Sequence, residues 1–287
     1  MLRWQIESGA DEAIGETPVD RYAGSRNARI LREARVSAPP AAAAPAPIAP
    51  APPAIIEPPP PAAPPPRMAM APTLVSARQA GETARSLAAA AATVEALREA
   101  VAGFEGCDLR LTANQCVFAD GNPEARLMIV GEAPGAEEDR QGLPFVGPAG
   151  QLLDRMLAAI GLDRRSAYIT NVVYWRPPGN RNPTSAEIAT CLPFLERHIE
   201  LVRPEVLVLA GGVSAKALLG TTDGIMKLRG RWFMVPCAGL DRPIPTRAIF
   251  HPAYLLRTQA QKREAWHDLI EIAKRLRGSA LIPKDKS

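Results

Sequence analysis

The feature that most constrains the fold is an apolar run that ends abruptly in a loop bounded by glycines. Residues 127–130 read Leu-Met-Ile-Val and are followed by Gly-Glu-Ala-Pro-Gly. A short apolar run ended by turn residues is typical of a buried strand, and open α/β sheets bind ligands at the carboxyl ends of such strands. The two glycines permit tight turns, and Pro134 stiffens the loop between them. The alternative is a purely structural turn, and other motifs in the chain are needed to distinguish it from a ligand-binding loop.

Strand-like and helix-like segments alternate through the remainder of the chain. We predict strands at 126–131, 167–173, 205–210 and 247–250, a hairpin at 229–235, and helices at 80–104, 149–160, 184–202, 214–219 and 261–276. Strands separated by helices favour a parallel sheet covered on both faces. The predicted fold class is therefore α/β: a three-layer α/β/α domain with a mostly parallel four-stranded central sheet, preceded by a helix.

The amino-terminal part has a different composition. Fourteen of the 30 prolines lie between Pro39 and Pro66, among alanines and a single charge, Glu57. Such a segment cannot bury a core and is expected to form a disordered, extended spacer. We predict a weakly ordered arm at 1–38, a Pro/Ala-rich linker at 39–79 and a folded domain at 80–287. The arm could contact a protein partner.

Charge and cysteine usage set broad limits. The net charge of +4 and the pI of about 9.0 permit a nucleic-acid partner without indicating one strongly. No apolar run approaches the roughly 18 residues of a membrane-spanning helix, and the first residues lack a secretory core. Four widely spaced cysteines suit a reducing compartment. We expect a cytoplasmic monomer that does not contact membranes.

The ends of the predicted strands carry the residues suited to chemistry. Glu132 follows the first strand, Asn171 lies near the end of the second, and His251 follows the fourth. In a parallel sheet these ends meet at one edge. Phe145 and several arginines lie in the adjoining loops, which together suit a planar hydrogen-bonding ligand attached to phosphate.

Each of these residues also has a structural alternative. Asn171 could cap a turn, and Phe145 could belong to the core. His251 is more distinctive because a proline follows it in a fixed loop, whereas His198 and His267 lie within helical patterns.

Four longer motifs carry a family resemblance. They are GEAPGAEEDRQGLPFVGPAGQLLDRML at 131–157, YITNVVYWRPPGNRNP at 168–183, LRGRW at 228–232 and HPAYLLR at 251–257. Together, over residues 104–277, the chain resembles the family-4 uracil-DNA glycosylases. The resemblance implies that uracil is flipped out of single- or double-stranded DNA and its N-glycosidic bond is hydrolysed, which leaves an abasic site.

The resemblance also implies roles for individual residues. Phe145 would stack on uracil, Asn171 would bind its Watson–Crick edge, and His251 would stabilise the charge on the departing base. Glu132, Glu138 and the backbone of Ala133 would line the pocket near the sugar and the attacking water. DNA contacts would come from Arg176, Arg181, Leu255, Leu256 and Arg257, with the Leu-Leu-Arg loop wedged into the duplex.

The chain departs from the family at its iron–sulfur site. The family holds a 4Fe–4S cluster with four cysteines, of which Cys107 and Cys191 match two, while Phe104 and Trp175 occupy the other positions. Two thiolates do not make a four-cysteine site, so we expect no metal and no cofactor, with the two aromatic rings packing together instead. Retention of the cluster through Cys116 and Cys237 is the alternative.

The sequence is also compatible with two other functions. The chain could be a catalytically weak or inactive DNA- or protein-binding relative. It could also have a changed base preference or belong to a cross-linking branch of the superfamily, although it lacks an inserted basic loop with a histidine after Asn171.

Overall fold

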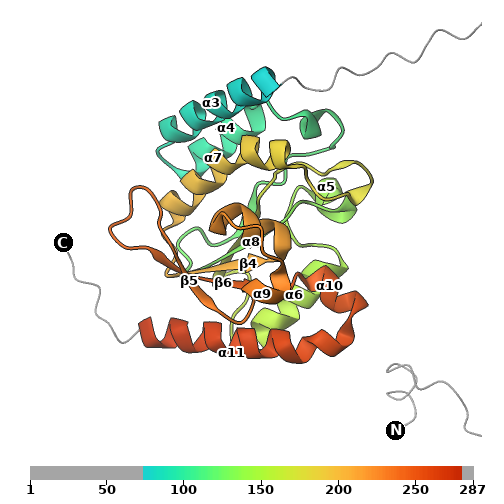
Figure 1. Cartoon of the computed structure of the whole chain (residues 1–287), viewed down its shortest axis with the longest axis vertical. Helices are drawn as coiled ribbons and strands as arrows, with labels where there is room; N and C mark the ends of the chain where they lie inside the picture. Colours follow the sequence, from blue (N-terminus) through green and yellow to red (C-terminus); the bar gives the residue numbers. More distant parts are fainter. Residues whose placement is uncertain (1–73, 280–287) are drawn as a thin grey trace, which may run out of the picture. The chain divides into compact units, whose positions relative to one another are not determined.

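A six-stranded mixed sheet runs through the part of the chain that the computed structural model describes, residues 74–279 (Figure 1). The predicted arm and nearly all of the predicted linker lie outside the described residues. The strands, in chain order, are β1 (Ala119–Gly121), β2 (Leu127–Gly131), β3 (Ala167–Asn171), β4 (Val206–Ala210), β5 (Trp232–Val235) and β6 (Ile244–Ile249). Their order in the sheet is β1-β3-β2-β4-β6-β5.

The predicted fold class is confirmed, but the predicted number of strands is wrong. The four central strands β3, β2, β4 and β6 are parallel, as expected. Two antiparallel edge strands are added, β1 beside β3 and β5 beside β6. β1 has only three residues, too few to show an alternating pattern. The predicted hairpin at 229–235 is instead a single strand that pairs with a later one, β6.

Helices cover both faces of the sheet (Figure 1). One core contains residues of α3, α4, α7 and α8 with alternate strand residues such as Met128 and Val130. The other contains residues of α6, α10 and α11 with the intervening strand residues Leu127 and Ile129. This alternation gives the predicted three layers, because successive side chains of a strand point to opposite faces. The helices are α3 (Leu74–Ala90), α4 (Val94–Gly103), α5 (Ala136–Gln141), α6 (Pro148–Ala158), α7 (Ser185–Val202), α8 (Gly212–Leu219), α9 (Ile225–Leu228), α10 (Pro252–Arg257) and α11 (Lys262–Ser279), with 3-10 helices η1 (Asp108–Leu111), η2 (Pro178–Asn180) and η3 (Gln259–Gln261).

The single helix predicted at 80–104 is two helices. α3 begins at Leu74, inside the predicted linker, and α4 begins after Thr93. The hydroxyl of Thr93 accepts a hydrogen bond from the Ala96 amide and so caps α4. Periodicity alone did not reveal the break because apolar residues continue at helical spacing on both sides. Among residues 74–279, no helix is both long and apolar enough to cross a membrane.

The register of the parallel strands aligns their carboxyl ends. Gly131 of β2 pairs with Asn171 of β3, and Ala210 of β4 pairs with Ile249 of β6. The chain passes from β2 to β3 on one side and then returns to place β4 on the other side of β2. Such a reversal opens a crevice at the strand ends, here between β2 and β4.

A buried ion cluster fastens α11 to the sheet. The carboxylate of Asp268, fully buried, accepts hydrogen bonds from Arg247 on β6 and from Arg229, which follows α9, at 2.8 to 3.0 Å. Asp268 thus pairs with two arginines, and the second charge is balanced by Glu264, which pairs with Arg229 at 3.0 Å. Removal of one partner of such a cluster leaves an uncompensated buried charge.

We expect Asp268→Ala to lower the free energy of unfolding by about 3–5 kcal/mol, because both guanidinium groups lose their buried partner. Urea denaturation followed by circular dichroism measures the change. Glu271→Gln on the same helix is the control, since Glu271 pairs only with Lys274 at the surface, and it should change stability by less than about 1 kcal/mol. Equal effects of the two substitutions would contradict this role of Asp268.

Candidate active site

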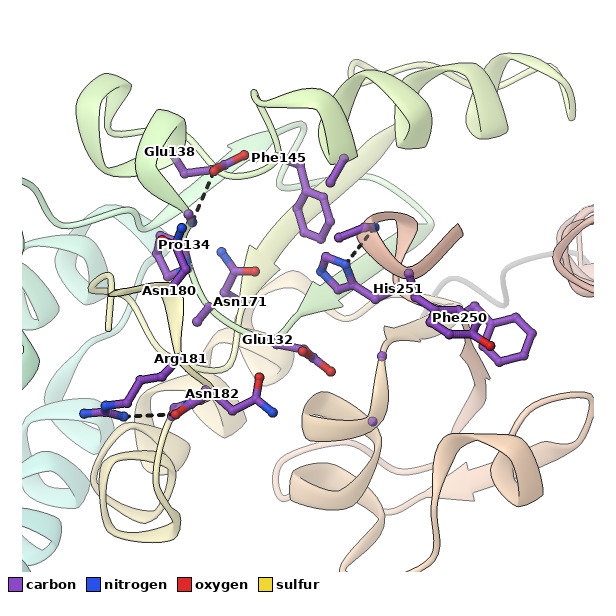
Figure 2. Close-up of a pocket in the computed structure, with 18 of the residues that line it drawn as sticks. Glu132, Pro134, Glu138, Phe145, Asn171, Asn180, Arg181, Asn182, Phe250 and His251 are labelled. Atoms are coloured by element: carbon purple, nitrogen blue, oxygen red, sulfur yellow. Dashed lines mark hydrogen bonds between the residues drawn. The ribbon is translucent and has the colours of Figure 1, made fainter. Parts of the chain in front are cut away.

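A cavity of about 560 Å³ lies at the carboxyl edge of the parallel strands (Figure 2). Its walls come from the loops after β2, β3, β4 and β6, as the aligned strand ends require. The lining residues are Glu132, Ala133, Pro134, Gly135, Glu138, Phe145, Ala149, Asn171, Asn180, Arg181, Asn182, Pro183, Gly211, Gly212, Ile225, Phe250, His251, Ala253, Tyr254 and Arg257.

Most of the predicted site residues meet in this cavity. They are Glu132, Ala133, Glu138, Phe145, Asn171, Arg181, His251 and Arg257. Figure 2 shows Phe145, Asn171, His251 and Glu132 around a common space, although they come from distant parts of the chain. The predicted residues that do not line it are Arg176, Leu255 and Leu256.

The carboxamide of Asn171 lines the cavity and can form hydrogen bonds with a ligand. The residue is the last of β3 and is 2% exposed, and its side chain has no hydrogen-bond partner among the described residues. Gly131 makes room for it: a Cβ atom there would lie 2.3 Å from Asn171 Oδ1 and 2.6 Å from the Phe145 ring. A glycine at this end of β2 therefore lets the carboxamide and the aromatic ring approach the same strand.

His251 is held in one orientation by the start of α10. Its Nδ1 accepts a hydrogen bond from the Ala253 amide at 3.1 Å, and its ring stacks on Phe145 with the centroids 5.4 Å apart. Burial lowers the pKa of His251 below its ordinary value, and this outweighs the opposing effect of the Glu132 carboxylate. The imidazole is therefore neutral near pH 7. Because Nδ1 is an acceptor, the proton lies on Nε2.

Glu132 lies in the crevice between β2 and β4. Its Oε1 accepts a hydrogen bond from the Val213 amide in the first turn of α8 at 2.9 Å. The partial positive charge of a helix amino terminus stabilises an anion at this place. Gly211, with a φ of 112°, allows the close approach, since a Cβ atom there would lie 2.3 Å from Oε1.

Glu138 is bonded to the backbone on both sides of the cavity loop. Its Oε2 accepts from the Gly135 amide at 3.1 Å, and its Oε1 accepts from Val146 and Gly147 at 3.0 and 2.9 Å. Three amide donors share this carboxylate, so its hydrogen bonds hold the segment that carries Phe145. The neighbouring acid Asp139, buried, plays a similar part by accepting from Asn114 and Gln115.

Phe145 has a strained backbone. Its φ is +55°, a value rarely adopted by residues other than glycine. Such conformations cost on the order of 1–3 kcal/mol and persist where the surrounding structure enforces them. The ring, 4% exposed, lies between Gly131 and His251.

The predicted DNA-contacting residues differ in exposure and in whether protein groups already bond them. Arg181 forms a bidentate ion pair with Glu187, and Arg176 donates a hydrogen bond to the side chain of Asn180. Leu255 is 1% exposed and belongs to the core, because it is on the inner face of α10, so it presents no surface to DNA in this conformation. Leu256 is exposed, and Arg257 lines the cavity without a protein partner among the described residues.

Several lining residues were not predicted from the sequence. Gly211 and Gly212 follow the third predicted strand, so the strand-end rule used for Asn171 could have found them. Asn180 and Asn182 flank Arg181 in a polar loop whose conformation, with a φ of +55° at Asn180, has no clear sequence signal.

The four positions of the family's cluster are all buried in one core. Cys191 donates to the Cys107 sulfur across 4.0 Å, which lowers the pKa of Cys107 and raises that of Cys191. Phe104 packs edge-on against Phe194, and Trp175 packs edge-on against Tyr174. The predicted direct pairing of Phe104 with Trp175 is not among the ring contacts of residues 74–279.

These residues do not fit a 4Fe–4S cluster. Such a cluster needs four thiolates, and here two thiols share the core with two aromatic side chains. Cys116 and Cys237 are partly buried and unpaired with other cysteines. Within the described part of the chain, no group of three or more histidine, cysteine or acidic side chains could hold a metal ion.

The amino-acid sequence was compared with known proteins. Residues 118–270 match the model of the uracil DNA glycosylase superfamily. The type-4 uracil-DNA glycosylase of Archaeoglobus fulgidus is 41% identical over 170 residues, which are 58% of this chain and 84% of the relative. The type-4 enzyme of Thermotoga maritima is also 41% identical, over 59% of this chain and 86% of its own length. The type-5 uracil-DNA glycosylase of Pyrobaculum aerophilum is 35% identical over 47% and 64%. This chain belongs to the uracil-DNA glycosylase superfamily.

Proposed function

We propose that this protein excises uracil from DNA by hydrolysis of the N-glycosidic bond. The observation that carries the proposal is the meeting of Asn171, His251 and Phe145 at one cavity, although they come from three distant segments of the chain. Their identities match the requirements of a flipped pyrimidine: an aromatic wall, a carboxamide for its edge and a donor for the departing oxygen. The 41% identity to two type-4 uracil-DNA glycosylases also supports this proposed activity.

Asn171 would read the base. Uracil presents a carbonyl acceptor beside an N–H donor, and a carboxamide matches both with its own N–H and carbonyl groups. Cytosine reverses this pattern at the corresponding positions, so a fixed Asn171 would discriminate against it. Burial and the close contact with Gly131 restrict the side chain to few orientations.

His251 would stabilise the base as it leaves. Bond cleavage places negative charge on the uracil oxygens, and a preorganised N–H donor lowers the energy of that state. The hydrogen bond from Ala253 fixes Nε2 as the donor. A neutral imidazole suffices because His251 is desolvated by burial, and a hydrogen bond is stronger in such an environment than in water.

Glu132 would act on the sugar side. Its carboxylate lies at the edge between β2 and β4, next to Ala133 in the same loop. An anion there stabilises the positive charge that develops on the sugar and can orient the attacking water. Glu138, which is committed to three amides, would support the pocket instead of exchanging protons.

DNA would approach along the outer rim of the cavity. Leu256 and Arg257 occupy the end of α10, where an exposed apolar side chain can fill the space vacated by the flipped nucleotide. Arg257 is placed for a phosphate contact. We propose that the activity is retained with no iron–sulfur cluster, because none of the proposed pocket residues is at a cluster position.

Substitution of the base-contacting residues tests the activity. We expect Asn171→Ala and His251→Ala each to reduce uracil release from a single-stranded oligonucleotide by about 100- to 1000-fold, as for the loss of a transition-state donor. His267→Ala, at an exposed position of α11, is the control and should be fully active. An inactive wild-type protein that still binds the oligonucleotide would favour the non-catalytic alternative.

The pH dependence reports the state of His251. Protonation would place a second N–H against the Ala253 amide, so the active form is neutral. Because burial lowers its pKa in the free protein, the acid limb of kcat/KM should lie below the ordinary histidine value of about 6.5. The pH profile should be flat between about pH 7 and 8, and a limb centred above pH 7 would contradict this assignment.

Purified protein should contain no iron. We expect a colourless preparation, no broad visible absorption band and less than about 0.1 iron per chain, because four thiolates are required and the core offers two. Elemental analysis of protein prepared without oxygen measures the iron. Cys107→Ala with Cys191→Ala should leave uracil release within about twofold of wild type, whereas stoichiometric iron that is lost in this variant would show that the cluster is retained.

A further inference from the structure

The loop that carries Phe145 is held from two sides by side chains outside the aromatic stack. Arg164, in the connection between α6 and β3, donates to the carbonyl oxygens of Pro144 and Phe145. Glu138 accepts from the next two amides, Val146 and Gly147. The peptide groups on both sides of the strained Phe145 are therefore bonded to charged side chains.

We propose that Arg164 is a positioning residue for the reaction, which acts by holding Phe145 in the conformation that stacks on the flipped base. This inference rests on the proposed function, because it assigns the stacking role to Phe145. Arg164 and Glu138 together are called the Phe145 clamp.

Four of the five N–H donors of Arg164 are used within the protein. Its Nε donates to Asp154 of α6 at 2.8 Å, and its Nη1 donates to Asp120 of β1 at 2.6 Å and to Pro144 at 3.1 Å. Its Nη2 donates to Phe145. All three nitrogens are thus used within the protein, so Arg164 ties the edge strand and α6 to the loop and has little left to offer a phosphate.

Helix α6 adds a steric constraint on the same peptide. A Cβ atom at Gly150 would lie 1.6 Å from the Phe145 carbonyl oxygen. The carbonyl therefore lies directly against the first turn of α6, in reach of Arg164. A backbone with a φ of +55° relaxes when its restraints are removed, and the ring would then leave its place between Gly131 and His251.

A guanidinium group is needed for this arrangement. Its planar fork can bond two carbonyls and two carboxylates at once, whereas the single ammonium group of a lysine cannot span them. Arg164→Lys therefore keeps a positive charge near Asp120 and Asp154 but loses hydrogen bonds to the carbonyl oxygens of Pro144 and Phe145. This variant separates the stabilising ion pairs from the positioning of Phe145.

A double-mutant cycle on kcat/KM for uracil release tests the inference. We expect Arg164→Gln to reduce kcat/KM between about 10-fold and 100-fold, the size expected of a misplaced pocket residue. In a Phe145→Ala background the same substitution should change it by less than about twofold, because there is no ring left to position. Arg164→Lys should fall between wild type and Arg164→Gln in kcat/KM while its urea midpoint stays closer to that of wild type.

Arg165→Gln is the matched control, because Arg165 is exposed and pairs only with Asp163. It should be fully active. Multiplicative, independent effects of Arg164→Gln and Phe145→Ala would overturn the proposal. A weaker dependence of KM on salt in Arg164→Gln would also overturn it, since that result indicates a lost phosphate contact.

Hydrogen exchange provides a readout that does not need activity. Amides of residues 142–150 should exchange several-fold faster in Arg164→Gln than in wild type, while those of β4 stay unchanged. If wild-type protein releases no uracil, the proposed function is wrong, and the exchange rates still test whether Arg164 holds the Phe145 loop. If wild type is active and exchange is unaltered, the clamp fails and the function stands.

Discussion

The site depends on the register of the four parallel strands. Because Gly131 is level with Asn171 and Ala210 is level with Ile249, the residues that follow each strand emerge at the same edge. The sequence separates Glu132 from His251 by more than a hundred residues, and the sheet brings both to one cavity (Figure 2). A shift of one strand by one residue would turn Asn171 to the other face of the sheet, and the cavity would lose its carboxamide.

The two acids of the GEAPG region illustrate how environment assigns a role. Glu132 accepts a hydrogen bond from one amide at the start of α8, and its carboxylate also lines the cavity. Glu138 accepts hydrogen bonds from the Gly135 amide and from the two amides that follow Phe145, so both of its carboxylate oxygens are bonded to the protein backbone. They are six positions apart in the chain. Only the first therefore suits the role that we propose for it beside the sugar and the attacking water.

The sequence predicted the strand ends well and the loops poorly, for a physical reason. Buried parallel strands are marked by continuous apolar runs, so the α/β fold and the edge that holds Asn171 and His251 could be inferred. β1 was missed because it has only three residues and depends on pairing with β3, about 50 residues away in the chain. β5 was predicted as part of a hairpin, and only its pairing with the later strand β6 was not recognised. Arg164 could not be recognised either. An arginine in a polar turn has no signature of its own, and its importance follows only from the carbonyls of Pro144 and Phe145 that it reaches.

The segment between Asn171 and the Arg176-Pro177-Pro178 loop supports the proposal that the site needs no cluster. From Asn171 to Trp175 every residue is at most 2% exposed, and Tyr174 and Trp175 are among the largest fully buried side chains. Each large apolar side chain contributes about 1.5–3 kcal/mol on burial. This run alone therefore anchors the carboxyl end of β3 by several kcal/mol without a metal ion. Because the anchor begins at Asn171 itself, the carboxamide is fixed by the core before any loop beyond Trp175 has to be ordered.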